Sequence, residues 1–548
     1  MLCRIESDQV YMGKLTGRSM IGFRDGASEV EPFHATNPVT GEHLAPGFFP
    51  ATPQETDLAA RLAADAFAVY SRTSGKKKAA FLRMIASKIE SVASEVIDRA
   101  GLETALPQAR LQGETARTCS QLRLFATVVE EGSWVGARID LADPDRKPLP
   151  KPDLRSMLLP LGPVVVFGAS NFPLAFSVAG GDTASALAAG NPVIVKAHAS
   201  HPGTSELVGR AVRESVRECG LPEGVFSLLF GSGARVGAVL VKHPLVRAGG
   251  FTGSRSAGRT LMDLAASRPE PIPFYAEMSS TNPVFILPGA LREHPDSIAV
   301  GLHASFTMGA GQFCTKPGMV FLAGGADEVP FRSKLRELVE TSVAFTLLTA
   351  NIHSSYRSAV ANRKSGGTAT VAAQAAEPSA GSGFAVGSIL FETDSASFLK
   401  NEGLASEVFG PTTLLVRNTS RDDMLEIASN LEGHLTATIH GNDQDLRDFA
   451  ELISVLERKV GRLVFNGFPT GVEVSHAMVH GGPYPSTSDG RSTSVGSQAI
   501  FRFTRAVCYQ GFPDHALPDE LKDANPLGIW RMVEGQMTRE VKSVIPSS

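Results

Sequence analysis

The sequence predicts an α/β protein built around a parallel β-sheet, and two observations carry this prediction. From residue 162 onward, short β-branched runs such as "GPVVVFGAS" and "NPVIVKAHAS" alternate with stretches of helical composition or spacing. Strands and helices that alternate in this way form parallel sheets, which bind ligands at the carboxyl ends of their strands. The chain also has 548 residues, too many for one compact core, so two or three domains are expected.

The elements follow in order along the chain. Residues 54–131 carry apolar residues at helical spacing and are predicted to be helical, whereas residues 140–162 are interrupted by prolines and are predicted to form an extended edge ribbon. Within the α/β region, Thr204 is predicted to be the N-cap of a helix. A second apolar unit runs from about 282 to 485, and residues 496–512 are predicted to be a strand outside both main domains.

The composition argues against several classes of function. The net charge is -4 and there is no long basic run, so nucleic-acid binding is not expected. No apolar run approaches the roughly 18 residues of a membrane span, and the N-terminus lacks the apolar core of a signal peptide. The five cysteines are scattered without a CxxC pair, which predicts neither a disulfide framework nor a metal site and favours a reduced, cytoplasmic setting.

The stretch "FTMGAGQFCTKPG" (306–318) places Cys314 among small residues. A buried cysteine most often acts as a small hydrophobe. A thiolate that attacks a carbonyl instead needs close backbone and a free N–H for the oxyanion, and the neighbouring glycines favour that interpretation. From these residues alone, both interpretations stay open.

Two further polar residues stand beside apolar runs. Asn171, just past the strand in "VVVFGASNFPLAF", is either a turn residue before Pro173 or an amide donor that faces the active centre. Glu277 lies between apolar neighbours in "PFYAEMSSTNP", where a carboxylate is costly unless it is paired or functional. It is interpreted either as a general base with a raised pKa or as half of a salt bridge.

Two glycine-rich turns, "FGSGARVG" (230–237) and "FTGSRSAG" (251–258), suit a pyrophosphate at a helix N-terminus. The second turn follows a predicted strand and contains Gly253 and Ser254. Neither turn is a complete GxGxxG motif, so neither alone establishes a dinucleotide site.

The order of six segments along the chain is more specific than any one of them: "SNFPLAF", "VIVKAHASHPGTSE", "FTGSRSAG", "YAEMSSTNP", "GQFCTKPG" and "SEVFGP". This set resembles the aldehyde dehydrogenase superfamily, and the resemblance covers almost the whole chain from "LTGRSMIG" onward. The stretch "NGFPTGVEVSHAMVHGGPYPSTSD" resembles the NADP-preferring branch, and the tail "LPDELKDANPLGIWR" is most similar to its 2-oxoglutarate semialdehyde (2,5-dioxopentanoate) dehydrogenases. Residues 1–13 have no counterpart there and are interpreted as a disordered extension.

The resemblance implies a fold of four parts. These are a Rossmann-type cofactor domain (14–139 and 161–285), an α/β catalytic domain (286–485), a small β oligomerisation flap (140–160 and 486–515) and a C-terminal tail (516–548). In the family the flap reaches onto a neighbouring subunit, and a long strand left alone would present an unpaired edge. A homodimer, or a dimer of such dimers, is therefore expected.

The resemblance also implies roles for single residues. Cys314 is the nucleophile that forms a thiohemiacetal with the aldehyde and then, after hydride transfer, a thioester. The Asn171 amide and the Cys314 backbone N–H form the oxyanion hole, and Glu277 activates the water that releases the acid. The implied contacts with the nicotinamide cofactor are Lys196, Gly253, Ser254, Glu407 and Phe409.

The choice between NAD and NADP depends on the end of the second strand, where an acid that binds the ribose 2′-hydroxyl would repel a 2′-phosphate. Ala199 stands three residues after Lys196, where NAD-preferring members often have glutamate. Arg235 matches a position that can meet the 2′-phosphate, although it also fits a surface helix arginine. NADP is therefore the expected cofactor, with NAD possible.

The expected reaction is oxidation of 2,5-dioxopentanoate to 2-oxoglutarate, and three alternatives stay open. A long-chain fatty aldehyde dehydrogenase would need an apolar tunnel. A CoA-acylating enzyme often lacks the glutamate at position 277, and an inactive relative would have lost Cys314 or Asn171. No motif assigns a residue to the substrate's remote carboxylate, for which Arg155 and Arg491 are guesses.

Overall fold

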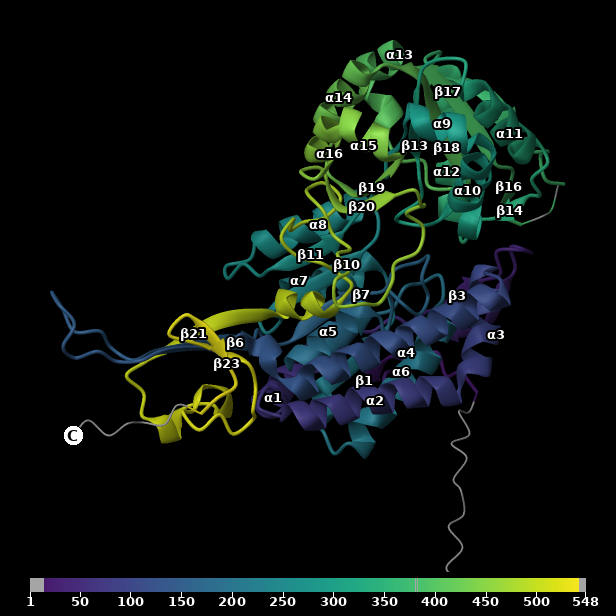
Figure 1. Ribbon diagram of the computed structural model, residues 1–548. Coiled ribbons are helices and arrows are strands. Elements are labelled where there is room, and N and C mark those ends of the chain that lie inside the picture. Colours follow the sequence, from purple (N-terminus) through teal and green to yellow (C-terminus); the bar gives the residue numbers. More distant parts are fainter. Residues whose placement is uncertain (1–13, 380, 382, 542–548) are drawn as a thin grey trace, which may run out of the picture.

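The computed structural model describes residues 14–379, 381 and 383–541, which form two large lobes and a small projecting sheet (Figure 1). Both large lobes contain a seven-stranded sheet with helices against it, as the α/β prediction requires. The extension predicted at residues 1–13 and the last seven residues of the predicted tail lie outside the described residues.

The first sheet has the strand order β11-β10-β7-β8-β9-β1-β2. Strands β11, β10, β7, β8 and β9 are parallel to one another, whereas β1 is antiparallel to both β9 and β2. Every residue of β7, β8 and β9 is buried because helices cover both faces. The strands are β1 (Met20–Ile21), β2 (Arg24–Asp25), β7 (Val164–Phe167), β8 (Val193–Lys196), β9 (Phe226–Leu229), β10 (Ala248–Thr252) and β11 (Phe274–Glu277).

The helices of this lobe confirm the predicted helical region at residues 54–131. They are α1 (Pro53–Tyr70), α2 (Gly75–Ser91), α3 (Ala93–Thr104), α4 (Gln108–Glu131), α5 (Gly181–Ala189), α6 (Pro202–Glu218), α7 (Ala238–Lys242) and α8 (Arg255–Ala266). A two-stranded ribbon of β3 (Phe33–Thr36) and β4 (His43–Phe48) precedes them.

The predicted N-cap at Thr204 is wrong. Helix α6 begins two residues earlier, at Pro202, with His201 as its N-cap. The Thr204 hydroxyl instead donates a hydrogen bond of 2.8 Å to the buried carboxylate of Glu103, which also accepts from the backbone N–H groups of Gly203 and Thr204. A carboxylate from α3 therefore caps the helix in place of a local side chain.

The second sheet has the order β15-β17-β18-β13-β12-β19-β20, with β15 antiparallel and the other strands parallel. Its strands are β12 (Val284–Ile286), β13 (Met319–Ala323), β15 (Thr370–Gln374), β17 (Ile389–Asp394), β18 (Thr412–Thr419), β19 (His434–His440) and β20 (Val460–Phe465). Strands β14 (Phe345–Thr346) and β16 (Ala385–Val386) form a separate ribbon. The helices are α9 (Pro288–Glu293), α10 (Pro295–Thr307), α11 (Glu328–Glu340), α12 (Ala350–Ser365), α13 (Ser395–Lys400), α14 (Arg421–Asn430), α15 (Asp443–Asp448) and α16 (Ala450–Leu456).

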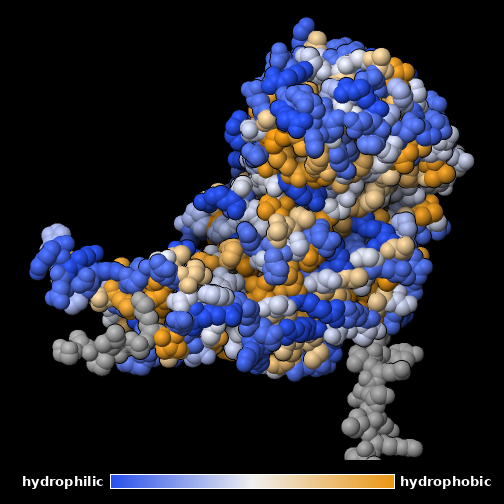
Figure 2. Space-filling view, viewed as in Figure 1, coloured by the Kyte–Doolittle hydropathy of each residue, from blue (hydrophilic) through white to orange (hydrophobic). Residues whose placement is uncertain are grey.

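The projecting sheet has the order β21-β6-β5-β22-β23 and joins segments from the middle and the end of the chain. Its strands are β5 (Arg138–Asp140), β6 (Leu154–Pro160), β21 (Thr504–Gln510), β22 (Arg531–Val533) and β23 (Gln536–Thr538), so residues of the predicted tail belong to it. Figure 2 shows hydrophobic side chains on this part of the surface, and its segments include the exposed residues Phe512, Leu527, Trp530 and Met537. The division into domains at the residue numbers given above stays a prediction.

The strand predicted at residues 496–512 is only half right. Residues Ser497–Phe503 form a 3₁₀-helix, and the strand begins at Thr504. Ala499, Ile500 and Phe503 are fully buried against the first lobe, with a spacing that places them on one face of a helical turn and not on alternating faces of a strand. In the described part of the chain, no helix is both long and apolar enough to cross a membrane.

Candidate active site

The carboxyl edge of the first sheet collects several of the predicted site residues. Lys196 and Glu277 are the last residues of β8 and β11, Asn171 follows β7, and Gly253 and Ser254 follow β10. These strands are neighbours in register, since Phe167 pairs with Lys196 and Phe251, and Thr252 pairs with Glu277. Residues scattered over more than a hundred positions of sequence therefore share one edge.

The amino edge of the second sheet supplies the opposite side of the site. Asn282 precedes β12, Cys314 precedes β13, and Glu407 and Phe409 precede β18, and these three strands are adjacent in the sheet. The two edges meet where the Asn171 Nδ2 donates a hydrogen bond of 2.8 Å to the backbone carbonyl of Gln312. The predicted nucleophile and its oxyanion donor are thus brought together.

The backbone before Cys314 explains the small residues of its loop. Gly309, Ala310 and Gly311 all have left-handed φ angles, of 56°, 59° and 67°. A Cβ at Gly311 would collide with the backbone carbonyl of Gly410, so this glycine lets two chain segments pack directly on each other. Gly311 is therefore small because of this backbone contact, whereas the sequence analysis linked the glycines to the needs of a thiolate that attacks a carbonyl.

The loop after Cys314 is held by an asparagine from the neighbouring strand. The Asn282 Nδ2 donates to the backbone carbonyls of Cys314, at 2.8 Å, and of Lys316, at 3.0 Å. Lys316 is itself buried and donates from Nζ to the carbonyls of Val408 and Thr412, at 2.7 and 2.9 Å. These bonds tie the cysteine loop to β12 and to the segment that carries Glu407 and Phe409.

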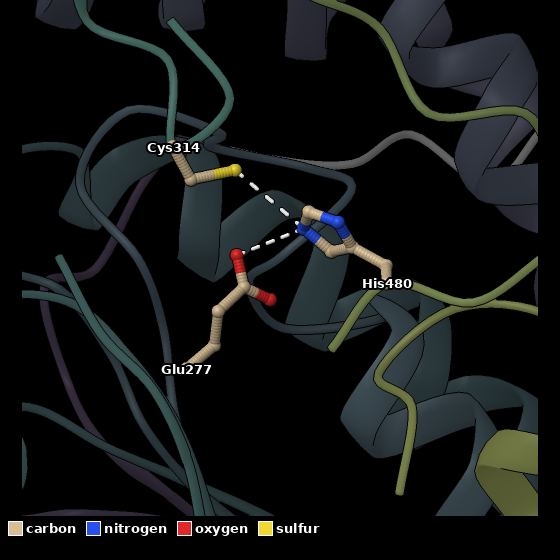
Figure 3. Close-up of side chains that lie close together, drawn as sticks. All are labelled: Glu277, Cys314 and His480. Atoms are coloured by element: carbon tan, nitrogen blue, oxygen red, sulfur yellow. Dashed lines mark hydrogen bonds and ion pairs between the residues drawn. The ribbon is translucent and has the colours of Figure 1, made fainter. Parts of the chain in front are cut away.

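A histidine completes the reacting centre (Figure 3). The Nε2 atom of His480 lies 2.8 Å from Oε1 of Glu277 and 3.5 Å from Sγ of Cys314. The other carboxylate oxygen of Glu277 accepts a bond of 2.9 Å from the Ser494 hydroxyl. Ligand atoms of Glu277, Cys314 and His480 all lie within 4.8 Å of one another, so the three side chains form one contact group.

The electrostatics of this group correct one prediction. Burial raises the pKa of Glu277, but the charge and hydrogen bond of His480 and the bonds from Ser494 and Cys314 outweigh it, and the pKa ends below its ordinary value. The raised pKa expected from the sequence is therefore wrong, and the pairing alternative is right. Burial raises the pKa of the Cys314 thiol well above its ordinary value, and the Glu277 carboxylate raises it further.

The proton between Glu277 and His480 follows from these directions. A carboxylate oxygen at 2.8 Å from a ring nitrogen requires a proton between the two atoms. Because Glu277 keeps a low pKa, that proton belongs to Nε2, and the imidazole donates it toward the carboxylate. The same N–H also faces the Cys314 sulfur, so it can stabilise a thiolate once one forms.

The cofactor edge is arranged differently. Lys196 is buried at the end of β8, and among the described residues its ammonium has no hydrogen bond or ion pair. Burial lowers its pKa to about 8. Gly253 and Ser254 are exposed at the start of α8, where Ser254 is the N-cap. Its hydroxyl accepts a bond of 3.3 Å from the Ala257 N–H, and the Arg255 N–H donates to the Ser279 hydroxyl at 3.4 Å.

Arg235 is exposed in the turn that follows β9, the strand next to β8. In the described part of the chain its guanidinium has no ion pair. The first acid after Lys196, Glu206, is buried and bonded to the backbone of Thr16 and Gly17, so it does not face the end of β8. His201 is also occupied, because its Nε2 lies 2.7 Å from the carbonyl of Ala169.

Residues 23–506 match the Aldehyde dehydrogenase family. This chain belongs to the aldehyde dehydrogenase family. It is 49% identical over 95% of its length to alpha-ketoglutaric semialdehyde dehydrogenase 2 of Azospirillum brasilense, of which 99% is covered. It is 45% identical over 96% of its length to the complete alpha-ketoglutaric semialdehyde dehydrogenase of Acinetobacter baylyi.

The solved structures agree on the fold. Betaine aldehyde dehydrogenase from Staphylococcus aureus, solved in complex with NAD+, superposes with a TM-score of 0.78 at 19% identity, over 91% of this chain and 96% of that one. The family to which this chain belongs oxidises aldehydes with NAD(P).

The residues of the cofactor edge fit such a nicotinamide dinucleotide. The buried Lys196 ammonium lacks a partner among the described residues, and ribose hydroxyls would supply one. The exposed helix N-terminus at Ser254 suits the pyrophosphate. Glu407 is partly buried beside the cysteine loop, where burial raises its pKa and Lys316 opposes that shift, and Phe409 lies next to it in the chain.

Neither arginine guessed for the substrate's far end lies at this site. Arg155 belongs to β6 of the projecting sheet, where it pairs with Asp153 and Asp523, both at 2.9 Å. The Arg491 side chain is 93% exposed and contacts Asp489 at 3.3 Å. Each guanidinium already has acidic partners, so the structure lends neither guess support.

The aldehyde dehydrogenase site also contains residues that sequence reasoning missed. His480 lies in the stretch 466–489, which was matched to the NADP-preferring branch but was given no catalytic role, and Ser494 follows that stretch. Asn282 lay in the quoted run "STNP" and was not singled out. The available signal was a fully buried histidine in a glycine-rich loop, yet only the tertiary structure shows that it faces Cys314.

Proposed function

We propose that this enzyme oxidises 2,5-dioxopentanoate to 2-oxoglutarate, prefers NADP, and releases the acid by hydrolysis. The observation that carries the chemistry is the contact group of Cys314, His480 and Glu277 (Figure 3). The substrate is supported by two relatives at 49% and 45% identity, both named as alpha-ketoglutaric semialdehyde dehydrogenases.

The first step makes the nucleophile. The thiol proton of Cys314 passes to the Glu277 carboxylate, with which it shares a hydrogen bond. The His480 N–H then donates its hydrogen bond to the thiolate, 3.5 Å from Nε2, instead of to the neutralised carboxyl. This exchange lowers the cost of forming a charged sulfur in a buried place.

The second step forms the thiohemiacetal. The sulfur attacks the aldehyde carbon, and the oxygen that becomes negative is stabilised by the Cys314 backbone N–H and the Asn171 amide. One Asn171 N–H is held by the Gln312 carbonyl at 2.8 Å, which fixes the amide and leaves its second N–H for the oxyanion. A nicotinamide cofactor held by Lys196, Ser254, Glu407 and Phe409 would supply the hydride acceptor, and loss of hydride from the tetrahedral carbon would leave a thioester on Cys314.

The third step hydrolyses the thioester. Glu277 returns its proton to solvent and then accepts one from the water that attacks the acyl carbon. Its lowered pKa keeps it ionised at neutral pH, and Ser494 and His480 hold both of its oxygens in place. A water-activating carboxylate at this position favours a free acid over a CoA ester.

The preference for NADP rests on the charge pattern at the end of β8. Ala199 stands where NAD-preferring members often have glutamate, and Glu206 is bonded to the backbone of Thr16 and Gly17, so neither position brings an acid to the end of β8. Arg235 is exposed one strand away, with its guanidinium available for a phosphate.

The assembly is a homodimer or a dimer of such dimers, with the projecting sheet at the interface. Strand β21 forms an edge of that sheet, and hydrophobic residues such as Trp530 and Met537 are exposed on it. Light scattering at micromolar concentration should give at least twice the chain mass of 57.9 kDa.

Steady-state kinetics on 2,5-dioxopentanoate, succinate semialdehyde and dodecanal, each with NADP and NAD, test the function. The highest kcat/KM should belong to 2,5-dioxopentanoate with NADP. A preference for dodecanal would identify a fatty aldehyde dehydrogenase instead, and a requirement for CoA would overturn the hydrolytic step.

A further inference from the structure

Helix α4 (Gln108–Glu131) brings an arginine to the reacting centre that no step above uses. Among the described residues, Arg117 makes one hydrogen bond, from Nε to the carbonyl of Val472 at 3.0 Å, and no ion pair. Its Nη2 atom is buried and has no partner there. A buried guanidinium nitrogen without an acceptor is costly, so its persistence calls for an anion that the chain itself does not supply.

Two contacts of one aromatic ring relate Arg117 to the reacting centre. Its guanidinium carbon lies 5.1 Å from the centre of the Phe176 ring, and the same ring lies 5.9 Å from the imidazole of His480. His480 in turn contacts Cys314. One phenylalanine therefore separates the guanidinium from the side chain that faces the reacting sulfur.

The surroundings of Arg117 are apolar. Phe176 clusters with Ala169, Ala175 and Val495, and Phe172, Val472 and Met478 pack against this group. Phe172 and Phe176 follow Asn171 in the chain, so this apolar cluster is continuous with the segment that carries the oxyanion donor. In such a setting, a single cation that keeps its charge can orient a ligand with one anionic end.

A second arginine on the same helix, Arg110, has the ion pair that Arg117 lacks. Arg110 is ion-paired with Glu114 at 3.2 Å and lies over the rings of Phe172 and Phe313, at 4.4 and 4.5 Å. Glu114 also accepts from the backbone of Leu174 and Ala175 and so has no capacity to spare. Arg110 is thus committed to the protein, whereas Arg117 is not.

Arg117 does touch the loop at Val472, which suggests a purely structural use. That loop, however, has another arginine that holds it: Arg462 of β20 donates to the carbonyls of Gly471 and Pro469, at 3.1 and 2.6 Å. The single bond from Arg117 leaves the rest of its guanidinium directed elsewhere.

We propose that Arg117 forms a carboxylate-binding subsite that receives the remote carboxylate of the substrate while the aldehyde carbon lies at Cys314. This inference rests on the proposed function, because it supplies the anion recognition that a semialdehyde with a distant carboxylate needs. A guanidinium and a carboxylate make charge-assisted hydrogen bonds, and the apolar walls strengthen them.

The test compares Arg117→Met and Arg117→Lys with wild type on 2,5-dioxopentanoate and on pentanal, which has the same chain length without the charge. For Arg117→Met, kcat/KM for the acid should fall roughly ten- to hundredfold, mainly through KM, as expected for one lost charge-assisted contact. The value for pentanal should stay the same or rise. Arg117→Lys should keep part of the preference for the acid.

Arg123→Met is the matched control, because Arg123 lies on the same helix but is exposed and paired with Glu90. It should change neither substrate. Equal losses on both substrates in Arg117→Met and Arg117→Lys would show that Arg117 only supports the loop, and an unchanged preference for the acid would also overturn the subsite. A wild-type enzyme that does not prefer the acid over pentanal would contradict the proposed substrate, before any variant is considered.

Discussion

The reacting centre and the cofactor edge treat their charged groups in opposite ways. At the centre, each reactive side chain has a protein partner: Glu277 is bonded to His480 and Ser494, and Asn171 to the Gln312 carbonyl. Along the cofactor edge, by contrast, neither Lys196 nor Arg235 has an ion pair among the described residues.

This difference separates chemistry from binding. A centre whose donors and acceptors are already in place needs no reorganisation when the substrate arrives, which is how preorganised sites lower barriers. Cations without partners weaken the free protein and are satisfied only when an anionic or hydroxyl-rich ligand binds. Changes at the centre should therefore reduce turnover, and changes along the edge should alter affinity and the stability of the free enzyme.

The largest effect should come from Cys314→Ala. Covalent catalysis requires the sulfur, whereas cofactor binding does not, so turnover should disappear while NADP affinity, measured by thermal shift, stays near normal. Cys508→Ala is the control, because Cys508 is exposed on β21, and it should keep full activity. A Cys314→Ala enzyme with a tenth of wild-type turnover would rule out the nucleophile assignment.

The next largest effect should come from His480→Gln. His480→Gln keeps a polar side chain but removes the imidazole N–H that faces both Glu277 and Cys314. At neutral pH, kcat/KM should fall by about 10²–10³, the usual cost of losing one hydrogen-bond donor placed at a developing negative charge. The loss should shrink as pH rises, because the thiol, whose pKa is already raised by burial and by Glu277, then ionises without help.

Alkylation of Cys314 by iodoacetamide over a pH series gives an independent reading of this prediction. In His480→Gln, the pH at which the alkylation rate of Cys314 rises should be higher than in wild type. A histidine that only fills space would leave the alkylation profile unchanged, and its replacement would reduce activity by the same factor at every pH.

The sequence was informative where function depends on strand ends and uninformative where it depends on tertiary neighbours. The alternation of strands and helices predicted the parallel sheet, and the residues at its carboxyl edge were found from their place after each strand. His480 could not be found in this way, because it lies 166 residues from Cys314 in a loop without regular structure.

Local patterns also failed where a distant residue changes the outcome. Glu277 was expected to have a raised pKa because its neighbours in the chain are apolar, yet His480 and Ser494 reverse the shift. Thr204 looked like an N-cap until the Glu103 carboxylate took over the end of α6. In both cases the deciding group comes from another element of the fold.

Along the cofactor edge, Arg235→Ala should weaken NADP without weakening NAD. One charge-assisted contact to a 2′-phosphate contributes about 1.5–3 kcal/mol, or roughly a ten- to hundredfold change in kcat/KM for NADP alone. Arg217→Ala is a suitable control, since Arg217 is a surface arginine of α6 paired with Glu214. Equal losses for both cofactors would show that Arg235 supports the turn and does not read the phosphate.

The smallest effect is expected in the free enzyme. Burial lowers the pKa of Lys196 from 10.5 to about 8, so the folded state carries the full cost of an unpaired charge below pH 8. Lys196→Met should remove that cost and raise the Tm of the cofactor-free protein by roughly 2–4 °C at neutral pH. The gain should decline between pH 8 and 10.5 and vanish above, where the lysine is neutral in both the folded and the unfolded state.

Lys316→Met is the control for Lys196→Met. It tests whether replacing any buried lysine would raise the Tm. Lys316 has a pKa that burial also lowers to about 8, but its ammonium donates to the carbonyls of Val408 and Thr412. Its replacement leaves two buried acceptors without donors and should lower the Tm. If Lys196→Met also lowered the Tm, or bound the cofactor as tightly as wild type, Lys196 would not be a cation that waits for a ligand, and the contrast between the two regions would fail.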